Sequence, residues 1–100
     1  MIEEVLGAPL RIRILLALWK WGEVNMTELA HILNTNYNQL ALHLKHLVDY
    51  GLVEEKRIGR ARLVKLRDAE PIHSLLQALA LADEELTKKT NIESPEKPPN

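Results

Sequence analysis

Residues 37–46 carry side chains that are suited to reading a polar surface. Asn and Gln can hydrogen-bond the edge of an adenine, Leu can contact a thymine methyl group, and a Tyr hydroxyl can reach a phosphate. We therefore expect one set of residues to face a groove of double-stranded DNA: Tyr37, Asn38, Gln39, Leu42, His43 and His46. The alternative is that they form an ordinary solvated helix face.

A second stretch, residues 56–67, carries six basic side chains and no acidic one. Residues 1–55 hold four basic and seven acidic side chains, and residues 68–100 hold three and seven, so the net charge of the whole chain is only −1. An exposed basic strip acts locally, within a Debye length of about 8–10 Å, so its position matters more than the total. We expect Arg57, Arg60 and Arg62 to contact phosphates, although lysines and arginines also keep edge strands soluble.

The sequence gives little support for metal binding or catalysis. The chain has no cysteine, which excludes disulfides, thiolate metal sites and a cysteine nucleophile. His43 and His46 lie one helical turn apart, but no third metal ligand is near them in the sequence. There is no glycine-rich phosphate loop and no nucleophile elbow, so we expect no catalytic residues, no enzyme activity, no cofactor and no bound metal.

The length and composition place these side chains on one small domain. One hundred residues, of which 46% are hydrophobic and 27% charged, suffice for a single core. No apolar run approaches the roughly 18 residues of a membrane span, and the N-terminus lacks the pattern of a secretory signal. We therefore expect no membrane contact and a cytoplasmic location.

Helical signals dominate the first half of the chain. Residues 9–21 are almost entirely apolar, with a proline in the first turn and Gly22 at the end, and a short helix over residues 2–6 precedes them. The spacing of Asn25 and Glu28 is that of a capping box, which predicts a helix ending near residue 33. A polar break over residues 34–36 then leads into a helix over 37–50.

The pattern changes after Gly51. Residues 52–58 and 61–66 read as two strands joined by a turn at Gly59-Arg60. A last helix is expected over 68–89, and the proline-rich residues 90–100 are expected to form a disordered tail. The order of elements predicts a mainly α fold with a small β-hairpin (α+β), namely a winged helix-turn-helix domain over 1–67, whose second helix of the pair fits the major groove.

Short motifs in the same order resemble the ArsR-type winged-helix repressors. They are LGAPLRIRIL at residues 6–15, TELA at 27–30, HLKHL at 43–47 and GLV at 51–53, and the likeness covers residues 6–67. The resemblance implies a homodimeric, sequence-specific DNA-binding transcription regulator, often built on contacts between the terminal helices.

The chain also departs from that family. It lacks the cysteine pair of the family's metal sensors, and His73 is followed by acidic residues at 83–85 without a second histidine. Ala41 and Leu42 stand where relatives often carry a Ser-Arg pair, so a groove-facing arginine is missing. Metal sensing is therefore not supported by the sequence.

The apolar surface exceeds what a core of about 60 residues needs. The helices over 9–21 and 68–89 both carry long apolar series, which either pack on their own domain or are buried in a two-fold dimer. We expect a homodimer with the last helix as its dimerisation helix, through Leu10, Ile14, Leu75, Leu76, Leu79 and Leu86.

The functional hypothesis is a homodimeric, sequence-specific DNA-binding transcription regulator. Its recognition helix would be 37–50 and its basic wing 52–67. The alternative is a winged-helix module that binds other proteins and no specific DNA.

Overall fold

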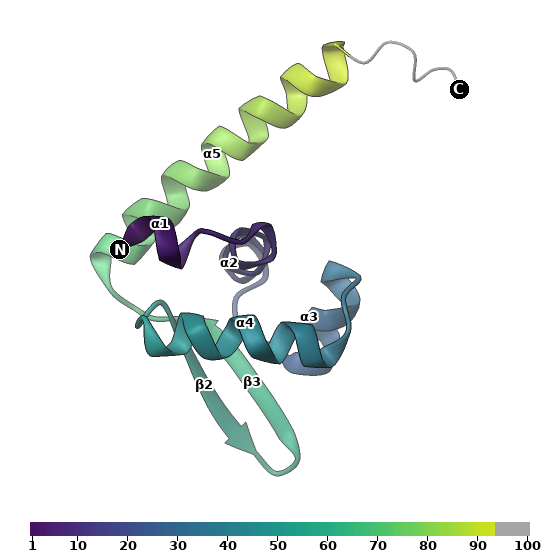
Figure 1. The fold of residues 1–100 in the computed structure, drawn as a ribbon, viewed down its shortest axis with the longest axis vertical. Helices are drawn as coiled ribbons and strands as arrows, with labels where there is room; N and C mark the ends of the chain where they lie inside the picture. Colours follow the sequence, from purple (N-terminus) through teal and green to yellow (C-terminus); the bar gives the residue numbers. More distant parts are fainter. Residues whose placement is uncertain (94–100) are drawn as a thin grey trace.

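The computed structural model describes residues 1–93 of the chain. Its elements follow the order α1 (Ile2–Val5), α2 (Pro9–Trp21), β1 (Val24–Asn25), α3 (Met26–Leu33), α4 (Tyr37–Asp49), β2 (Val53–Ile58), β3 (Ala61–Leu66) and α5 (Glu70–Glu93) (Figure 1). Helix α2 lies centrally, α3 and α4 pack beside it, and the β2–β3 hairpin projects from the body on the side away from α5.

Two asparagines start the helices of the α3–α4 pair. The side-chain oxygen of Asn25 accepts a hydrogen bond from the backbone N–H of Glu28 at 2.7 Å, and that of Asn36 accepts one from Gln39 at 2.8 Å. Each bond satisfies an N–H that has no partner within its helix. Asn34 ends α3 in the left-handed conformation, with φ of 54°, so the predicted three-residue break turns the chain directly into α4.

The hairpin belongs to a three-stranded antiparallel sheet of order β1-β3-β2, in which β1 was not expected from the sequence. Val24 and Asn25 of β1 pair with Val64 and Leu63 of β3, which ties the start of α3 to the hairpin. Gly59, with φ of 61°, takes the first position of the two-residue turn, where an L side chain would be strained.

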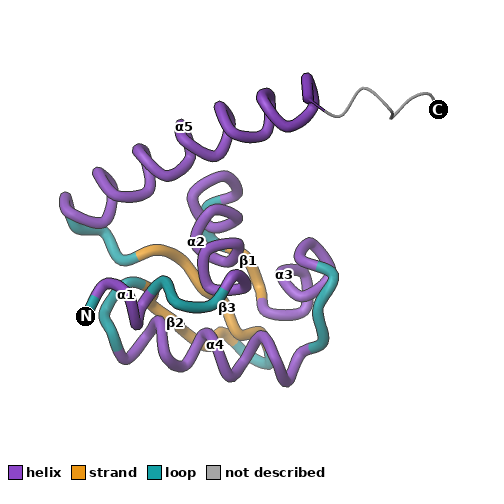
Figure 2. The backbone as a smooth tube through the Cα atoms, turned by 45° about the horizontal axis from the view of Figure 1, so that its top comes forward, coloured by secondary structure: helices purple, strands orange, loops and turns teal. Residues whose placement is uncertain are grey.

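Helices α2 and α4 lie beside the strands of the sheet (Figure 2). One apolar core joins the helices to the base of the hairpin. Leu40, Leu44 and Leu47, spaced four and three residues apart, form the buried stripe of α4, and Val48 is half-buried beside them. The strands add Val53 and Val64 to this core. Because one stripe of α4 is completely enclosed, the direction of every other side chain on that helix is set.

Helix α5 departs from the body as it proceeds (Figure 1). Ile72 and Leu76 are buried, whereas every residue from Leu81 to Thr90 is exposed. The helix runs to Glu93 and so extends four residues past the predicted end at 89. The first proline after residue 89, which would interrupt a helix, is Pro95. The rest of the expected tail, 94–100, lies outside the described residues.

The predicted fold class is confirmed: a mainly α domain with a small β-hairpin, arranged as a winged helix-turn-helix. Within residues 1–93 no helix combines the length and the apolar character that crossing a membrane requires.

Candidate nucleic-acid interface

Helix α4 presents a polar face to solvent. Six of its residues are exposed. Asp49 lies at its end, and we call the other five the recognition face: Tyr37, Asn38, Gln39, Leu42 and Lys45. Lys45 was missed by the sequence analysis, although it lies three residues after Leu42 and therefore on the same side of a helix. Its ammonium group pairs with Asp49 at 3.4 Å.

His43 and His46 lie at the edge of this face and are half-buried. The Nε of Arg11 donates a hydrogen bond to Nδ1 of His43 at 3.2 Å, and the same guanidinium donates to the backbone carbonyl of Glu4. Nδ1 of His43 is thus directed to α2, and the contact of this side chain with a DNA groove stays a prediction. His46 lies near Tyr50, with the two ring centroids 6.5 Å apart.

Helix α2 holds both helices of the pair through its arginines. Arg11 reaches α4 through His43, and Nη2 of Arg13 donates to the carbonyl of Leu33, in the last turn of α3, at 3.1 Å. A carbonyl in the last turn of a helix has no partner within it, so the Arg13 bond also satisfies an otherwise open acceptor.

The burial of His43, together with the nearby charges, makes the stability of the protein depend on pH. Burial lowers the pKa of His43 below its ordinary value of 6.5, and the positive charges of Arg11 and His46 lower it further. Below about pH 6.5 the unfolded chain then binds a proton that the folded chain resists, so stability falls as the pH falls from that value toward the lowered pKa. His43→Asn keeps an acceptor near the Nδ1 position and cannot take up this proton.

We expect the free energy of unfolding of the wild type to fall more than that of His43→Asn between about pH 7.5 and about pH 5.5. Urea denaturation followed by circular dichroism at the two pH values measures both declines. Equal declines in the two proteins would show that His43 does not resist protonation.

The basic hairpin has two different faces. On its outer face Lys56 pairs with Glu23 at 3.3 Å, and Lys65 pairs with Glu54 at 4.0 Å. Side chains alternate along a strand, so Glu55, Arg57 and Arg62 lie on the face that also carries the buried Val53 and Val64.

The charge of the hairpin is therefore smaller than the sequence suggested. Glu54 and Glu55 belong to β2, and with them residues 52–67 carry six basic and two acidic side chains, a net charge of +4. Three of the six cations counted over residues 56–67, namely Lys56, Arg62 and Lys65, have acidic partners. Arg57 and Arg60 are exposed and take part in none of the ion pairs within residues 1–93.

Arg62 links the hairpin to helix α4. Its Nε donates to the carboxylate of Glu55, and its Nη1 donates to the hydroxyl of Tyr37 at 2.8 Å. The hydrogen bond from Arg62 lowers the pKa of Glu55, and the bond to Glu55, followed by that to Tyr37, raises the pKa of Arg62 above its ordinary value. Its guanidinium also lies 5.8 Å from the centroid of the Tyr37 ring.

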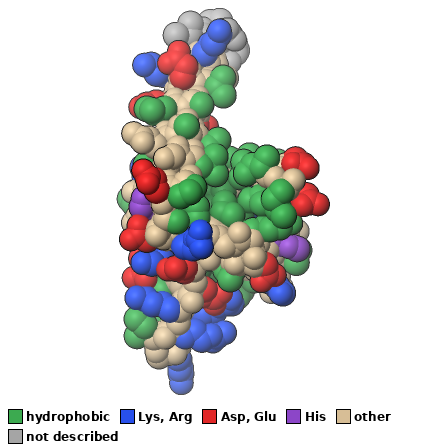
Figure 3. Space-filling model, turned by 90° about the vertical axis from the view of Figure 1, so that its left-hand side faces the viewer, with side chains coloured by type: hydrophobic (Ala, Val, Ile, Leu, Met, Phe, Trp, Pro, Cys, Tyr) green, Lys and Arg blue, Asp and Glu red, His purple; other side chains and the backbone are tan. Residues whose placement is uncertain are grey.

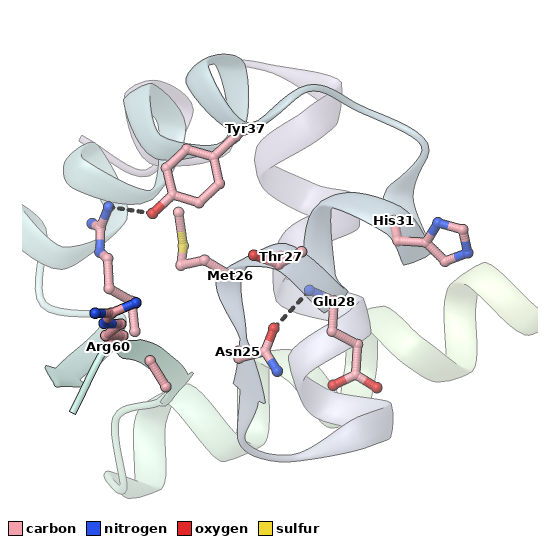
Figure 4. Close-up of a pocket in the computed structure, with 9 residues that line it drawn as sticks. Asn25, Met26, Thr27, Glu28, His31, Tyr37 and Arg60 are labelled. Carbon is pink, nitrogen blue, oxygen red and sulfur yellow. Dashed lines mark hydrogen bonds between the residues drawn. The ribbon is translucent and has the colours of Figure 1, made fainter. Parts of the chain in front are cut away.

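A shallow hollow of about 670 Å³ opens between the start of α3, the start of α4 and the tip of the hairpin (Figure 4). Asn25, the last residue of β1, and Thr27 of α3 line it on one side, with Tyr37 of α4 and with Arg60 and Arg62 of the hairpin. Thr27 was not predicted to lie at this surface, because it is more than 30 residues before the hairpin tip in the chain. Figure 4 shows the Tyr37 ring reaching across the hollow toward the hairpin, with its hydroxyl at that end.

The residues predicted for a dimer interface fall into two groups. Ile14 and Leu76 are completely buried inside their own domain, so the prediction is corrected for these two, which offer no surface to a second copy. Leu10, Leu75 and Leu79 are half-buried, and Leu86 is 63% exposed. Figure 3 shows hydrophobic side chains spreading from α5 onto the body, with Lys and Arg gathered over the hairpin below.

Side chains that bind metals do not gather in the described part of the chain. Among residues 1–93 there is no cluster of three or more His, Cys, Asp or Glu side chains that could hold an ion.

Comparison with known proteins identifies relatives of the chain. A family model described as a helix-turn-helix domain matches residues 6–56. None of the curated proteins compared with the chain matches it. Among solved structures, Mb0332 from Mycobacterium bovis is 27% identical, with a TM-score of 0.71, and the match covers 85% of this chain and 78% of that one. It is described as a homodimeric winged helix-turn-helix DNA-binding domain and a possible ArsR-family transcriptional regulator.

Two more distant structures share the fold. The AntR antimony-specific transcriptional repressor is 23% identical, with 85% of this chain and 76% of that one covered and a TM-score of 0.71. HlyU from Vibrio cholerae is 22% identical, with 78% and 83% covered and a TM-score of 0.71. The resemblance to ArsR-type winged-helix regulators is thereby confirmed.

Proposed function

Because the chain belongs to the helix-turn-helix domain family, we propose that it is a transcription regulator that binds specific DNA sequences as a homodimer. The proposal includes a cytoplasmic location and involves no catalytic step, cofactor or metal. The observation that carries it is the juxtaposition of the recognition face of α4 with Arg57 and Arg60 at the hairpin tip, two cations that form no ion pair within residues 1–93.

In this proposal α4 enters the major groove. Asn38 and Gln39 are exposed in its first turn, where a recognition helix contacts base edges, and their amides suit adenine. Leu42 is 54% exposed on the same face and can contact a thymine methyl group. Lys45 lies on the same face as an ion pair with Asp49, whereas His43 contributes by anchoring the helix to Arg11.

The hairpin supplies affinity that does not depend on sequence. Arg57 and Arg60 are exposed near the tip and can neutralise backbone phosphates, which releases condensed counterions. The outer lysines are directed away from the recognition face and have acidic partners, so we assign them no role in DNA binding.

The dimer would place two recognition helices on one duplex. Half-buried leucines and the exposed Leu86 leave apolar surface along α5 that a second copy would cover, and Mb0332, which shares the fold, is described as homodimeric. A two-fold dimer matches two half-sites about one helical turn apart, so a partly palindromic site is expected.

The test is a selection of bound fragments from fragmented genomic DNA, followed by titration of the recovered duplex. We expect one enriched motif with two related halves, and a binding constant that falls steeply with salt, by a slope of about 0.9 for each neutralised phosphate in a plot of log K against log salt.

Two results would contradict the proposal. No retardation of genomic fragments at micromolar protein would favour the alternative of a protein-binding module, for which the exposed Leu42 would be the natural contact. Binding that does not change between low and moderate salt would exclude phosphate contacts by the hairpin.

A further inference from the structure

The cluster of Glu55, Arg62 and Tyr37 joins the hairpin to the first residue of the recognition helix. Arg62 donates to both partners, and Glu55 and Arg62 are the least exposed ion pair in the described part of the chain, with 23% and 24% of their side chains exposed. An arginine with a bound carboxylate brings little net charge to a phosphate. Its geometry, in contrast, is fixed by two directed hydrogen bonds.

Tyr37 is the part of the cluster that DNA can reach. Its side chain is 41% exposed and lines the hollow between α3, α4 and the hairpin tip. The phenol oxygen already accepts a hydrogen bond from Arg62, so its own hydrogen is left to donate to another group. Accepting from a guanidinium also polarises the hydroxyl and makes it a stronger donor.

We propose that Tyr37 contacts a phosphate and that Arg62 is a positioning residue which acts through Tyr37. This inference rests on the proposed function. Glu55 holds Arg62, Arg62 holds the Tyr37 hydroxyl, and the hydroxyl donates to a phosphate oxygen of the DNA backbone at the hollow. Arg60, which lines the same hollow, would neutralise the charge of the backbone there. This indirect role replaces the direct phosphate contact that the sequence predicts for Arg62.

The two roles of Arg62 differ in their dependence on salt. A direct contact releases counterions, so its removal lowers the salt slope by about 0.9 for each phosphate lost. A neutral hydroxyl donor releases none. The variant Glu55→Gln/Arg62→Met removes the ion pair without changing the net charge and keeps an unbranched side chain at position 62, so any change in slope reports a lost phosphate contact.

The experiment measures binding by fluorescence anisotropy to a labelled duplex recovered by the wild type from random DNA, at several salt concentrations. Tyr37→Phe keeps the ring and removes the donor, and we expect it to weaken binding about tenfold with the salt slope unchanged. Glu55→Gln/Arg62→Met should weaken binding by a similar factor, again with the slope unchanged. In the Tyr37→Phe background the same double change should weaken binding by less than about twofold, because the hydroxyl that Arg62 positions is already absent.

Each outcome separates this inference from the proposed function. If the wild type recovers no duplex, the function itself fails. If the wild type binds and Glu55→Gln/Arg62→Met lowers the salt slope, or weakens binding equally with and without the Tyr37 hydroxyl, then Arg62 contacts DNA directly and the positioning role is wrong. Circular dichroism melting of each variant excludes a loss of binding through unfolding. If Tyr37→Phe alone binds the duplex as tightly as the wild type, the phosphate contact by Tyr37 is wrong.

Discussion

Leu86→Glu is expected to convert a dimer of twice 11.4 kDa into a monomer and to weaken binding to a two-half-site duplex at least about 100-fold. Leu86 is 63% exposed and lies seven residues, about two turns, after the half-buried Leu79, so it continues the same apolar stripe beyond the end of the core. A carboxylate buried there between two copies would have no partner. A monomer would then engage each half-site alone and lose the gain from linked binding.

Leu81→Glu is the matched control for this prediction. Leu81 is 60% exposed on the same helix, but it lies two residues after Leu79 and therefore about 200° around the helix axis from it. We expect Leu81→Glu to leave the mass from light scattering and the affinity for DNA close to those of the wild type. A monomeric wild type, or a dimer that survives Leu86→Glu, would show that this stripe of α5 does not form the interface.

The recognition helix is the part of the site that was predictable from sequence. The leucine spacing from Leu40 to Leu47 defines a buried stripe, and a helix with one stripe fixed has its opposite face fixed too. Asn38, Gln39 and Leu42 can therefore be assigned to the exposed side from the spacing of the leucines alone. His43 lies at the border of the two faces, and only the position of Arg11, 32 residues away, decides where its ring is directed.

The hairpin was predicted less completely, for a reason that lies in strand pairing. The positions of Glu54, Glu55 and Glu23 relative to the basic residues depend on the register of β2 against β3 and on the approach of the segment around β1. Strand β1 has only two residues, too few for an alternating pattern to appear. Counting charges along the chain therefore overestimated the number of free cations.

Arg57→Gln/Arg60→Gln should weaken binding to the selected duplex at least about 100-fold, since each lost bond to a phosphate costs about 1.5–3 kcal/mol. Both residues are exposed, and a dimer carries each of them twice, so the salt slope should fall by up to about 3.6. The discrimination between the selected site and a scrambled duplex should change little, because phosphate contacts position the protein without reading sequence.

The same hairpin supplies the control for charge. Lys56→Gln/Lys65→Gln removes the same number of positive charges within a few residues of the tip, but from the outer face, where Glu23 and Glu54 already pair with these lysines. We expect this variant to bind within about threefold of the wild type with the slope nearly unchanged, because exposed ion pairs contribute little and the lysines do not reach the DNA. Equal losses in the two variants would mean that the hairpin acts only through its total charge, and that the two-faced arrangement of its cations has no part in binding.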